Sequence, residues 1–279
     1  MNTPTGSFVV GLSDVAGVRV LAVDATAAAE ELRARHGLSG HAAVAASEGL
    51  IAAQLMSAYI KGEERLTLQF QCEQPRFAMI ADVHADGATR GRFTPAVIPR
   101  SRPLRGAIMV IKHDATRELY RGVAPVEDTD FQGALQAYLV HSQQAVGVVR
   151  IQAELDDQGA VRVAHGLLVE KLPDQETSVF EDLFGGLAEA SLDRVLPAVL
   201  AGEIWGFPMK ILETRALRFA CTCSHERSRD ILMGLGIDEL NALLAEQGTA
   251  EMTCNFCLDL YSFDGDEVRE IIREIQARP

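Results

Sequence analysis

The sequence has few aromatic residues and no long apolar run. Phe, Trp and Tyr together make up 6% of the 279 residues, whereas 48% are hydrophobic, which is ordinary for a soluble globular protein able to bury a core. No stretch of 18 or more consecutive apolar residues occurs, so no transmembrane helix is expected. The first residues, Met1 to Ser7, contain neither a basic nor an apolar stretch, so we expect no secretory signal and a cytoplasmic location.

Positive charge is also in short supply. The chain has 26 Lys and Arg against 39 Asp and Glu, which gives a net charge of −13. Nonspecific binding to nucleic acid or to an anionic membrane surface is therefore disfavoured. One short basic cluster, Arg100, Arg102 and Arg105, includes Pro99 and Pro103 and is interpreted as an exposed loop, with a specific anion site as the alternative.

Cysteine is scarce and unevenly placed. Only five occur, four of them between Cys221 and Cys257, while Cys72 lies far from the others in a segment that alternates like a strand. In a cytosolic chain, clustered cysteines more often bind metal or act in redox chemistry than form permanent disulfides. Cys72 is predicted to be a small buried or half-buried residue.

The N-terminal region predicts strands followed by helices. Apolar and β-branched residues over 7–24 predict two short strands with Gly11 and Gly17 at the turn between them. Asp24 is expected to cap a helix that ends near His36. A second helix, about residues 40–60, is apolar nearly all round, which indicates a helix buried in the core.

From residue 65 onward the pattern alternates. Leu66, Leu68 and Phe70 fall on one face of a predicted strand, and Phe77 and Met79 do the same in the next, so an antiparallel meander is expected. Further strands are predicted at 107–111, 118–124, 146–154 and 161–169, with a helix at 131–142. Grouped strands and helices favour an α+β fold over a doubly wound one.

After Pro173 the pattern changes. Residues 174–210 read as short helices interrupted by glycine and proline, and such helices have little stability of their own. We therefore predict three parts: an α+β core domain over 1–173, a helical linker over 174–220, and a small C-terminal domain over 221–279 that contains the four clustered cysteines. An ordinary helical hairpin of the core is the alternative for the middle part. The tail predicts a strand over 258–263 and a helix over 264–277, capped by Asp264.

The four clustered cysteines form two short motifs. Cys221 and Cys223 are separated by one residue, and Cys254 and Cys257 by two. Four thiolates satisfy tetrahedral zinc, so these four residues are predicted to bind one Zn²⁺. His225 could replace one of them, but with four thiolates available it is interpreted as a solvated neighbour.

Zinc also changes the redox chemistry of such a site. A free thiol has a pKa near ~8.5 and is mostly protonated at neutral pH, whereas a zinc-bound cysteine is held as the thiolate. An oxidant that converts such a sulfur to sulfenic acid allows a neighbouring thiol to form a disulfide. Structural zinc can contribute roughly 10–16 kcal/mol to folding, so losing it should unfold the module that depends on it.

This region resembles the redox-regulated 33 kDa chaperonin family (heat shock protein 33). The resemblance is carried by the cysteine spacing and by residues that follow each motif. Weaker similarity extends upstream over nearly the whole chain. The matching segments are Cys221-Thr222-Cys223-Ser224-His225-Glu226-Arg227, Leu243-Leu244-Ala245-Glu246, Cys254-Asn255-Phe256-Cys257, Tyr261-Ser262-Phe263, Tyr120-Arg121-Gly122-Val123, His141-Ser142-Gln143-Gln144, and Gly166-Leu167-Leu168 to Pro173.

The resemblance implies an ATP-independent holdase, a chaperone and not an enzyme. Reduced and zinc-bound it would be inactive; oxidised, it would form the disulfides Cys221–Cys223 and Cys254–Cys257, release zinc, unfold its linker, form a homodimer and bind unfolding client proteins. The chain departs from the family pattern at Gln143 and Glu170, which lie far from the cysteines and bear on core packing or dimerisation.

Two other functions are weighed against this one. A binding module could use the zinc as a fixed clip for protein or RNA contact, although the net charge of −13 argues against RNA. A thiol–disulfide oxidoreductase could use Cys254 and Cys257, but a thioredoxin-like enzyme places that motif after a strand in a βαβ unit. Here a helix and a short polar turn are predicted before Cys254.

No catalytic residue is predicted. On pattern alone, the apolar linker residues are candidates for client contact once the linker unpacks and equally for packing at rest: Val179, Phe180, Leu183, Phe184 and Leu187.

Overall fold

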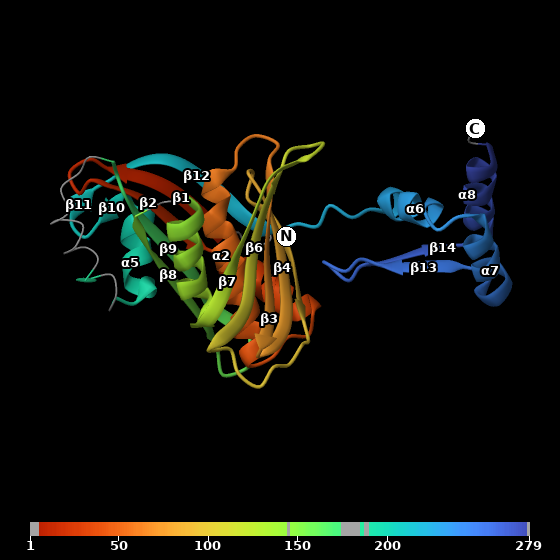
Figure 1. Ribbon diagram of the computed structural model, residues 1–279, viewed down its shortest axis with the longest axis horizontal. Helices are drawn as coiled ribbons and strands as arrows, with labels where there is room; N and C mark the ends of the chain where they lie inside the picture. The colour runs from red at the N-terminus through yellow and green to blue at the C-terminus, as the bar shows by residue number, and fades with distance from the viewer. Residues whose placement is uncertain (1–5, 144–145, 174–184, 187–189, 278–279) are drawn as a thin grey trace. The chain divides into compact units, whose positions relative to one another are not determined.

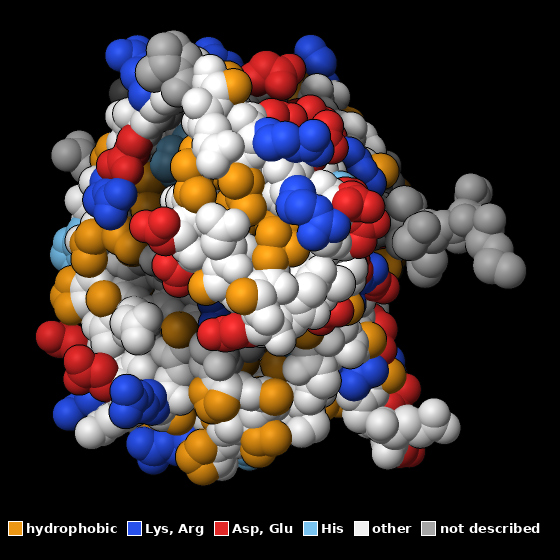
Figure 2. Space-filling model, turned by 90° about the vertical axis from the view of Figure 1, so that its right-hand side faces the viewer, with side chains coloured by type: hydrophobic (Ala, Val, Ile, Leu, Met, Phe, Trp, Pro, Cys, Tyr) orange, Lys and Arg blue, Asp and Glu red, His pale blue; other side chains and the backbone are white. Residues whose placement is uncertain are grey.

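The computed structural model describes residues 6–143, 146–173, 185–186 and 190–277. The chain divides into two compact units, Met1–Ala220 and Cys221–Pro279, and each is described by itself. The described residues include no helix that is both long and apolar enough to cross a membrane. On the face drawn in Figure 2, acidic and basic side chains are intermingled and no large basic patch is visible.

The first unit is built on one sheet of ten strands. Its strands are β1 (Gly6–Ser13), β2 (Val18–Asp24), β3 (Arg65–Gln74), β4 (Arg76–His84), β5 (Ala88–Thr94), β6 (Leu104–His113), β7 (Glu118–Thr129), β8 (Gly147–Leu155), β9 (Val161–Lys171) and β12 (Lys210–Phe219). Their order is β7-β6-β3-β4-β5-β12-β1-β2-β9-β8. All neighbours are antiparallel except β12 and β5, which pair in parallel through Arg218 opposite Ala88 and Phe219 opposite Thr89. The late strand β12 therefore joins the two halves of the sheet.

Helices fill the inner face of this sheet. They are α1 (Thr26–Arg35), α2 (His41–Met56) with the 3₁₀ turn η1 (Ser57–Tyr59), and α3 (Phe131–Tyr138) with the π-helical turn η2 (Leu139–Gln143). Of the 16 residues of α2, 14 are buried, which confirms the prediction of a core helix. It packs on β8, β9 and β4 (Figure 1). Helix α3 contacts both edge strands, β7 and β8, so the sheet curls around its core.

The alternating segments are strands, as predicted. Leu66, Leu68 and Phe70 on β3 are buried together with Phe77 and Met79 on β4, and these strands pair antiparallel. The buried faces of β3 and β4 belong to one large apolar cluster that the sheet and its helices shield from water. The α+β fold class is confirmed.

Two local predictions at the N-terminus are wrong. Gly11 lies inside β1, beside a bulge, and not at the turn. A Cβ atom there would come 2.4 Å from the Met209 sulfur, so glycine leaves room for the Met209 side chain and does not serve turn geometry. Asp24 ends β2 and does not occupy the N-cap position of α1, which is Ala25; its carboxylate accepts a hydrogen bond from the Thr26 backbone N–H at 3.0 Å.

Ion pairs and a hydrogen bond link separate elements of the first unit. Glu170, one of the departures from the family pattern, forms an ion pair with Arg19 at 2.9 Å and accepts a hydrogen bond from the Tyr59 hydroxyl. Of the basic cluster, Arg102 pairs with the buried Glu48 at 2.8 Å and Arg105 pairs with Asp128. These two arginines are therefore engaged by carboxylates within the unit.

Within residues 190–220 the structure has one helix and three strands. They are α5 (Leu192–Leu200), β10 (Glu203–Ile204), β11 (Phe207–Pro208) and β12. Leu192, Leu196 and Val199 of α5 are buried against β2 and β9 in a second apolar cluster. The division of the chain at 173 and 220 stays a prediction. Val179, Phe180, Leu183, Phe184 and Leu187 lie outside the described residues.

The second unit is small. It contains α6 (His225–Met233), α7 (Ile237–Gln247), the hairpin β13 (Ala250–Thr253) and β14 (Leu260–Phe263), and α8 (Gly265–Ala277). Its described core has seven buried apolar residues: Leu232, Leu240, Ala250, Phe263, Val268, Ile271 and Ile272. Arg229 on α6 reaches Glu274 on α8 at 3.0 Å. As predicted, Asp264 caps α8; its carboxylate accepts from the Glu267 N–H at 2.9 Å.

Candidate metal centre

The four clustered cysteines meet in the second unit. Cys221 and Cys223 lie in the irregular segment between β12 and α6, and Cys254 and Cys257 lie in the turn of the β13–β14 hairpin. All four Sγ atoms lie within 4.8 Å of one another. The Sγ atoms of Cys221 and Cys254 are 3.7 Å apart, and those of Cys223 and Cys257 are 3.2 Å apart. The fold thus brings both motifs to one point.

This sulfur cluster suits a tetrahedral metal ion. Zinc–sulfur bonds of ~2.3 Å in a tetrahedron place the sulfurs about 3.8 Å apart, close to the longer of the two distances. Burial and the three neighbouring sulfurs hold the pKa of Cys257 above its ordinary value, because thiolates crowded together repel one another. A cation among the sulfurs would remove that repulsion. The donor set therefore fits a thiolate-bound metal.

Backbone geometry prepares the Cys-x-x-Cys turn for anionic sulfur. The Leu258 N–H donates to the Cys254 carbonyl at 2.9 Å, and the Cys254 N–H donates to the Asp259 carbonyl at 3.0 Å, which closes the turn. Burial raises the pKa of the Cys254 thiol, but hydrogen bonds from the Cys257 and Phe256 backbone N–H groups outweigh it. The resulting pKa is about 7, below the ordinary thiol value.

The Cys-x-Cys half is fixed by the start of α6. Ser224, next to Cys223, is the N-cap of this helix, and its Oγ accepts a hydrogen bond from the Arg227 N–H at 3.1 Å. The Arg227 guanidinium also donates to the Thr222 carbonyl at 2.5 Å. The segment of Cys221 and Cys223 is irregular and not a strand, and both of its sulfurs lie in the four-sulfur cluster.

Two aromatic contacts border the sulfurs. The Tyr261 hydroxyl, on β14, donates a hydrogen bond to Cys223 Sγ at 3.0 Å, and this contact holds the pKa of Tyr261 above its ordinary value. The His225 ring lies on the Phe263 ring, with centroids 4.2 Å apart, and its side chain is 48% exposed. His225 is not among the four clustered ligands. The sequence analysis assigned Tyr261 no role, because a hydroxyl–sulfur contact across 38 positions leaves no local pattern.

The structure before Cys254 differs from the one predicted from the sequence. The prediction of a helix and a polar turn before Cys254 is wrong, because β13 directly precedes it. That strand pairs antiparallel with β14 immediately after the motif, from Ala250 opposite Phe263 to Thr253 opposite Leu260. The motif thus lies at the tip of a hairpin and not in the βαβ unit of a thioredoxin-like enzyme.

The match to a protein-family model decides the relationship. The model described as Hsp33 protein matches residues 7–264. The chain belongs to the Hsp33 family. The resemblance seen in the sequence is confirmed, and with it a chaperone function; chaperones are not a class of enzyme.

Similar proteins agree over nearly the full length of this Hsp33 chain. The 33 kDa chaperonin of Citrifermentans bemidjiense is 29% identical, over 97% of this chain and 98% of that protein. The 33 kDa chaperonin of Shouchella clausii is 27% identical, over 94% and 95%. The crystal structure of the 33 kDa chaperonin from Thermotoga maritima has a TM-score of 0.84 at 22% identity, covering 98% and 99%, and so shares the fold.

The remaining cysteine of this Hsp33 chain takes no part in the cluster. Cys72 lies on β3 in the first unit and is 1% exposed, as predicted. Burial raises the pKa of its thiol to about 12, so it stays protonated at neutral pH. In the described part of the chain, the four cysteines are the one group of His, Cys, Asp or Glu side chains arranged to hold a metal.

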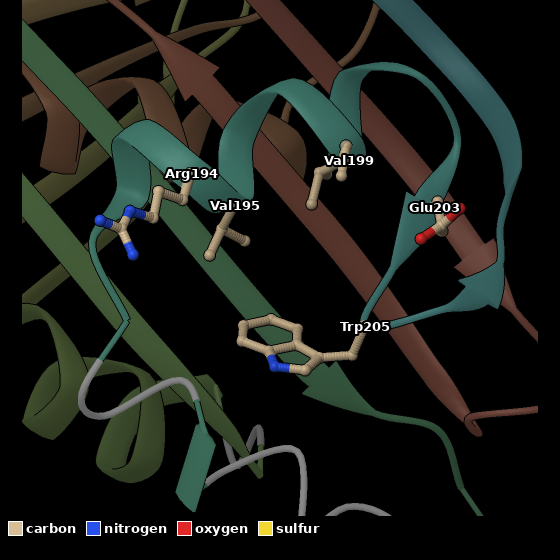
Figure 3. Close-up of a pocket in the computed structure, with 6 residues that line it drawn as sticks. Arg194, Val195, Val199, Glu203 and Trp205 are labelled. Atoms are coloured by element: carbon tan, nitrogen blue, oxygen red, sulfur yellow. The ribbon is translucent and has the colours of Figure 1, made fainter.

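This Hsp33 chain also has a small cavity beside α5. It has a volume of about 180 Å³ and lies between α5 and the β10–β11 hairpin. Val195 and Val199 point toward the indole of Trp205, with Arg194 and Glu203 at either end (Figure 3). This volume is below the roughly 300 Å³ of typical ligand pockets. The cavity carries no ligand assignment, but it places the single tryptophan of the chain against α5.

Proposed function

We propose that this chain is a cytoplasmic, redox-regulated chaperone that holds unfolding proteins without ATP and is switched by its four clustered cysteines. One observation carries the proposal: sulfurs from two motifs, 30 residues apart in sequence, lie within 4.8 Å of one another. Family membership supplies the chaperone function, and the cluster supplies groups that an oxidant can change. The predicted absence of nucleic-acid and membrane partners belongs to the same proposal.

The resting form is proposed to hold one Zn²⁺ through Cys221, Cys223, Cys254 and Cys257. Four cysteine ligands with no open position are typical of structural zinc sites. When bound, zinc would keep all four sulfurs as thiolates and offset their mutual repulsion. The backbone N–H groups of Phe256 and Cys257 would stabilise the same charge at Cys254.

Oxidation by a peroxide is the proposed switching step. A cysteine sulfur attacks one peroxide oxygen, the O–O bond breaks, and the second oxygen takes up a proton and leaves as water. The resulting sulfenic acid is attacked by the sulfur of a neighbouring cysteine, which forms the disulfide and expels a second water. Each disulfide thus passes two electrons to one peroxide, and because the cysteines are held as thiolates, the two protons that complete the two waters come from the solvent. By family resemblance, the partners are Cys221 with Cys223 and Cys254 with Cys257.

Loss of the thiolates is proposed to unfold the second unit. Disulfide sulfurs are poor metal ligands, and the apolar cluster among the described residues of the unit has seven buried members to hold it without a metal. A structural zinc site can contribute roughly 10–16 kcal/mol to folding, which matches or exceeds the whole stability of a small domain. By family resemblance, the linker over 174–220 then loosens, the chain forms a homodimer, and apolar surface becomes available to unfolding clients.

The test follows zinc, thiols and the linker together. Reduced, zinc-loaded protein is treated with hydrogen peroxide under mild heating, without ATP. We expect release of about one zinc per chain, loss of four thiols, and suppression of aggregation of a thermally unfolding client. Peptide mapping identifies the disulfides. Trp205, the single tryptophan, is half-buried near α5, so its emission should shift to longer wavelength if the linker loosens.

Two variants separate a switch from a fixed zinc clip. Cys221→Ser removes one ligand; a switch would become active without oxidant, whereas a clip would unfold or lose binding with no gain of chaperone activity. Cys72→Ala is the matched control, since Cys72 lies outside the cluster and should leave zinc binding and activation unchanged. Full retention of zinc under peroxide and heat would overturn the proposal.

A further inference from the structure

One hydrogen bond at the sulfur cluster crosses from one motif to the other. Tyr261 lies on β14, four positions after Cys257, and pairs with Met252 across the hairpin. Its hydroxyl donates to the Sγ atom of Cys223, in the other motif, at 3.0 Å. A residue of the Cys-x-x-Cys half thus reaches the sulfur of the Cys-x-Cys half.

We propose that Tyr261 is a positioning residue of the redox switch, and that its hydroxyl slows the oxidation of Cys223 in the resting protein. This inference rests on the proposed function, because it concerns the rate at which that switch responds. Tyr261 is assigned no contact with the oxidant. It acts through the sulfur to which it donates.

The physical reason lies in the electron pair that attacks the peroxide. Cys223 must give a sulfur electron pair to a peroxide oxygen while the O–O bond breaks and water leaves; a second cysteine then displaces water from the sulfenic acid. A hydrogen bond to the sulfur draws on that electron pair and is lost as the S–O bond forms. Because a sulfur whose electron pair is engaged by a donor is a weaker nucleophile, Cys223 should attack peroxide severalfold more slowly with this hydrogen bond than without it.

The ring and the hydroxyl of Tyr261 have separable roles. The ring is half-buried and packs against the small core that includes Phe263 and Val268. The hydroxyl extends beyond this packing to the sulfur. Tyr261→Phe therefore keeps the apolar contacts and removes only the donor, so the variant should fold and bind zinc.

The experiment compares two ways of emptying the site. Reduced, zinc-loaded wild-type protein and Tyr261→Phe are mixed with excess hydrogen peroxide, and zinc release and thiol loss are timed without a client. In parallel, zinc is withdrawn by a chelator under reducing conditions. Tyr120→Phe is the matched control, because the Tyr120 hydroxyl contacts Tyr138 in the first unit and no sulfur of the cluster. Brief alkylation, mapped by peptide, reports the reactivity of each cysteine.

We expect Tyr261→Phe to be oxidised severalfold faster than wild type, with enhanced alkylation at Cys223 and unchanged chelator-driven release. Tyr120→Phe should match wild type in both. Equal oxidation rates in wild type and Tyr261→Phe would overturn the inference. A parallel rise of both rates would also overturn it, since the hydroxyl would then only stabilise the fold. If wild-type protein binds no zinc or keeps it under peroxide, the proposed function itself fails.

Discussion

The two units of this chain achieve their folds by different means. In the first, a ten-stranded sheet wraps a helix with 14 of 16 residues buried, and the apolar cluster around that helix spans most of the sheet. In the second, seven buried apolar residues support three helices and a hairpin, beside four sulfurs within 4.8 Å of one another. Burial of apolar side chains stabilises a fold under any redox condition, whereas metal ligation by thiolates is lost under oxidising conditions. The switch is therefore expected in the unit with the smaller core.

Metal removal should separate the two units most clearly. Chelation of zinc from reduced protein should abolish amide-exchange protection in α6, α7 and α8 and leave the strands of the sheet that precede residue 174 protected. The loss of roughly 10–16 kcal/mol of binding free energy exceeds what the small core can offset. Cys254→Ser should do the same without chelator, whereas Cys72→Ala should not. Persistent protection of α8 after metal loss would show that the second unit folds by burial alone.

A core truncation should give the opposite pattern. Phe131 is fully buried in the first unit, with its ring centroid 4.5 Å from that of Phe70 and 5.9 Å from that of Phe77. Phe131→Ala should lower the free energy of unfolding by about 3–5 kcal/mol, because it removes these contacts and leaves a cavity. Urea unfolding followed by Trp205 emission measures this loss. Zinc affinity should not change; a weakened zinc site would mean that the units are coupled.

A buried carboxyl should make the first unit sensitive to pH. Burial raises the pKa of Glu48 on α2 to about 7, although Arg102 opposes the shift and Asp130 adds to it. Between pH 4.5, the ordinary value, and 7, the folded chain keeps a proton that the unfolded chain has lost. Stability is therefore full below this window and falls as pH rises through it, by at most about 1.4 kcal/mol per unit and about 3 kcal/mol in all.

Glu48→Gln should remove this slope. The amide keeps a hydrogen-bond acceptor for Arg102 and cannot ionise, so the variant should unfold at the same free energy across the window. Glu31→Gln, at a partly exposed position on α1, is the matched control and should retain the wild-type slope. The measurement is urea unfolding at a series of pH values. A wild-type slope in Glu48→Gln would assign the effect to another group.

Features of the fold and the site could be predicted from the sequence where the signal was local, and could not where it depended on distant residues. Alternation at Leu66 and Leu68, the all-round apolar pattern of α2 and the spacing of the cysteines each depend on a few neighbouring residues. The position of β12 between β5 and β1 does not depend on neighbouring residues, because it follows from pairing with strands more than a hundred residues away. Gly11 and Tyr261 are of the second kind, since each is explained only by a distant sulfur atom.

The smallest predicted effect is the loss of stability when the N-cap side chain of one helix is removed in each unit. The Ser224 side chain accepts from the Arg227 N–H at the start of α6, and the Asp130 side chain accepts from the Gly133 N–H at 2.8 Å at the start of α3. Replacing either by Ala should cost about 1 kcal/mol of local stability. The consequences for zinc should differ, because α6 begins directly after Cys223 and α3 is in the sheet unit.

Ser224→Ala should therefore weaken zinc binding, since part of the binding free energy must then order the start of α6 beside Cys223. A cost of about 1 kcal/mol corresponds to about a fivefold loss of affinity, because 1.4 kcal/mol is a factor of ten. Asp130→Ala should lower the urea midpoint of the first unit through the lost cap, since the exposed contact of Asp130 with Arg102, at 3.5 Å, contributes little. It should leave zinc affinity unchanged, because α3 is in the sheet unit. Competition with a chromophoric chelator measures both affinities. Equal zinc affinity in the two variants would mean that the sulfurs converge without help from α6, and that the metal alone organises the second unit.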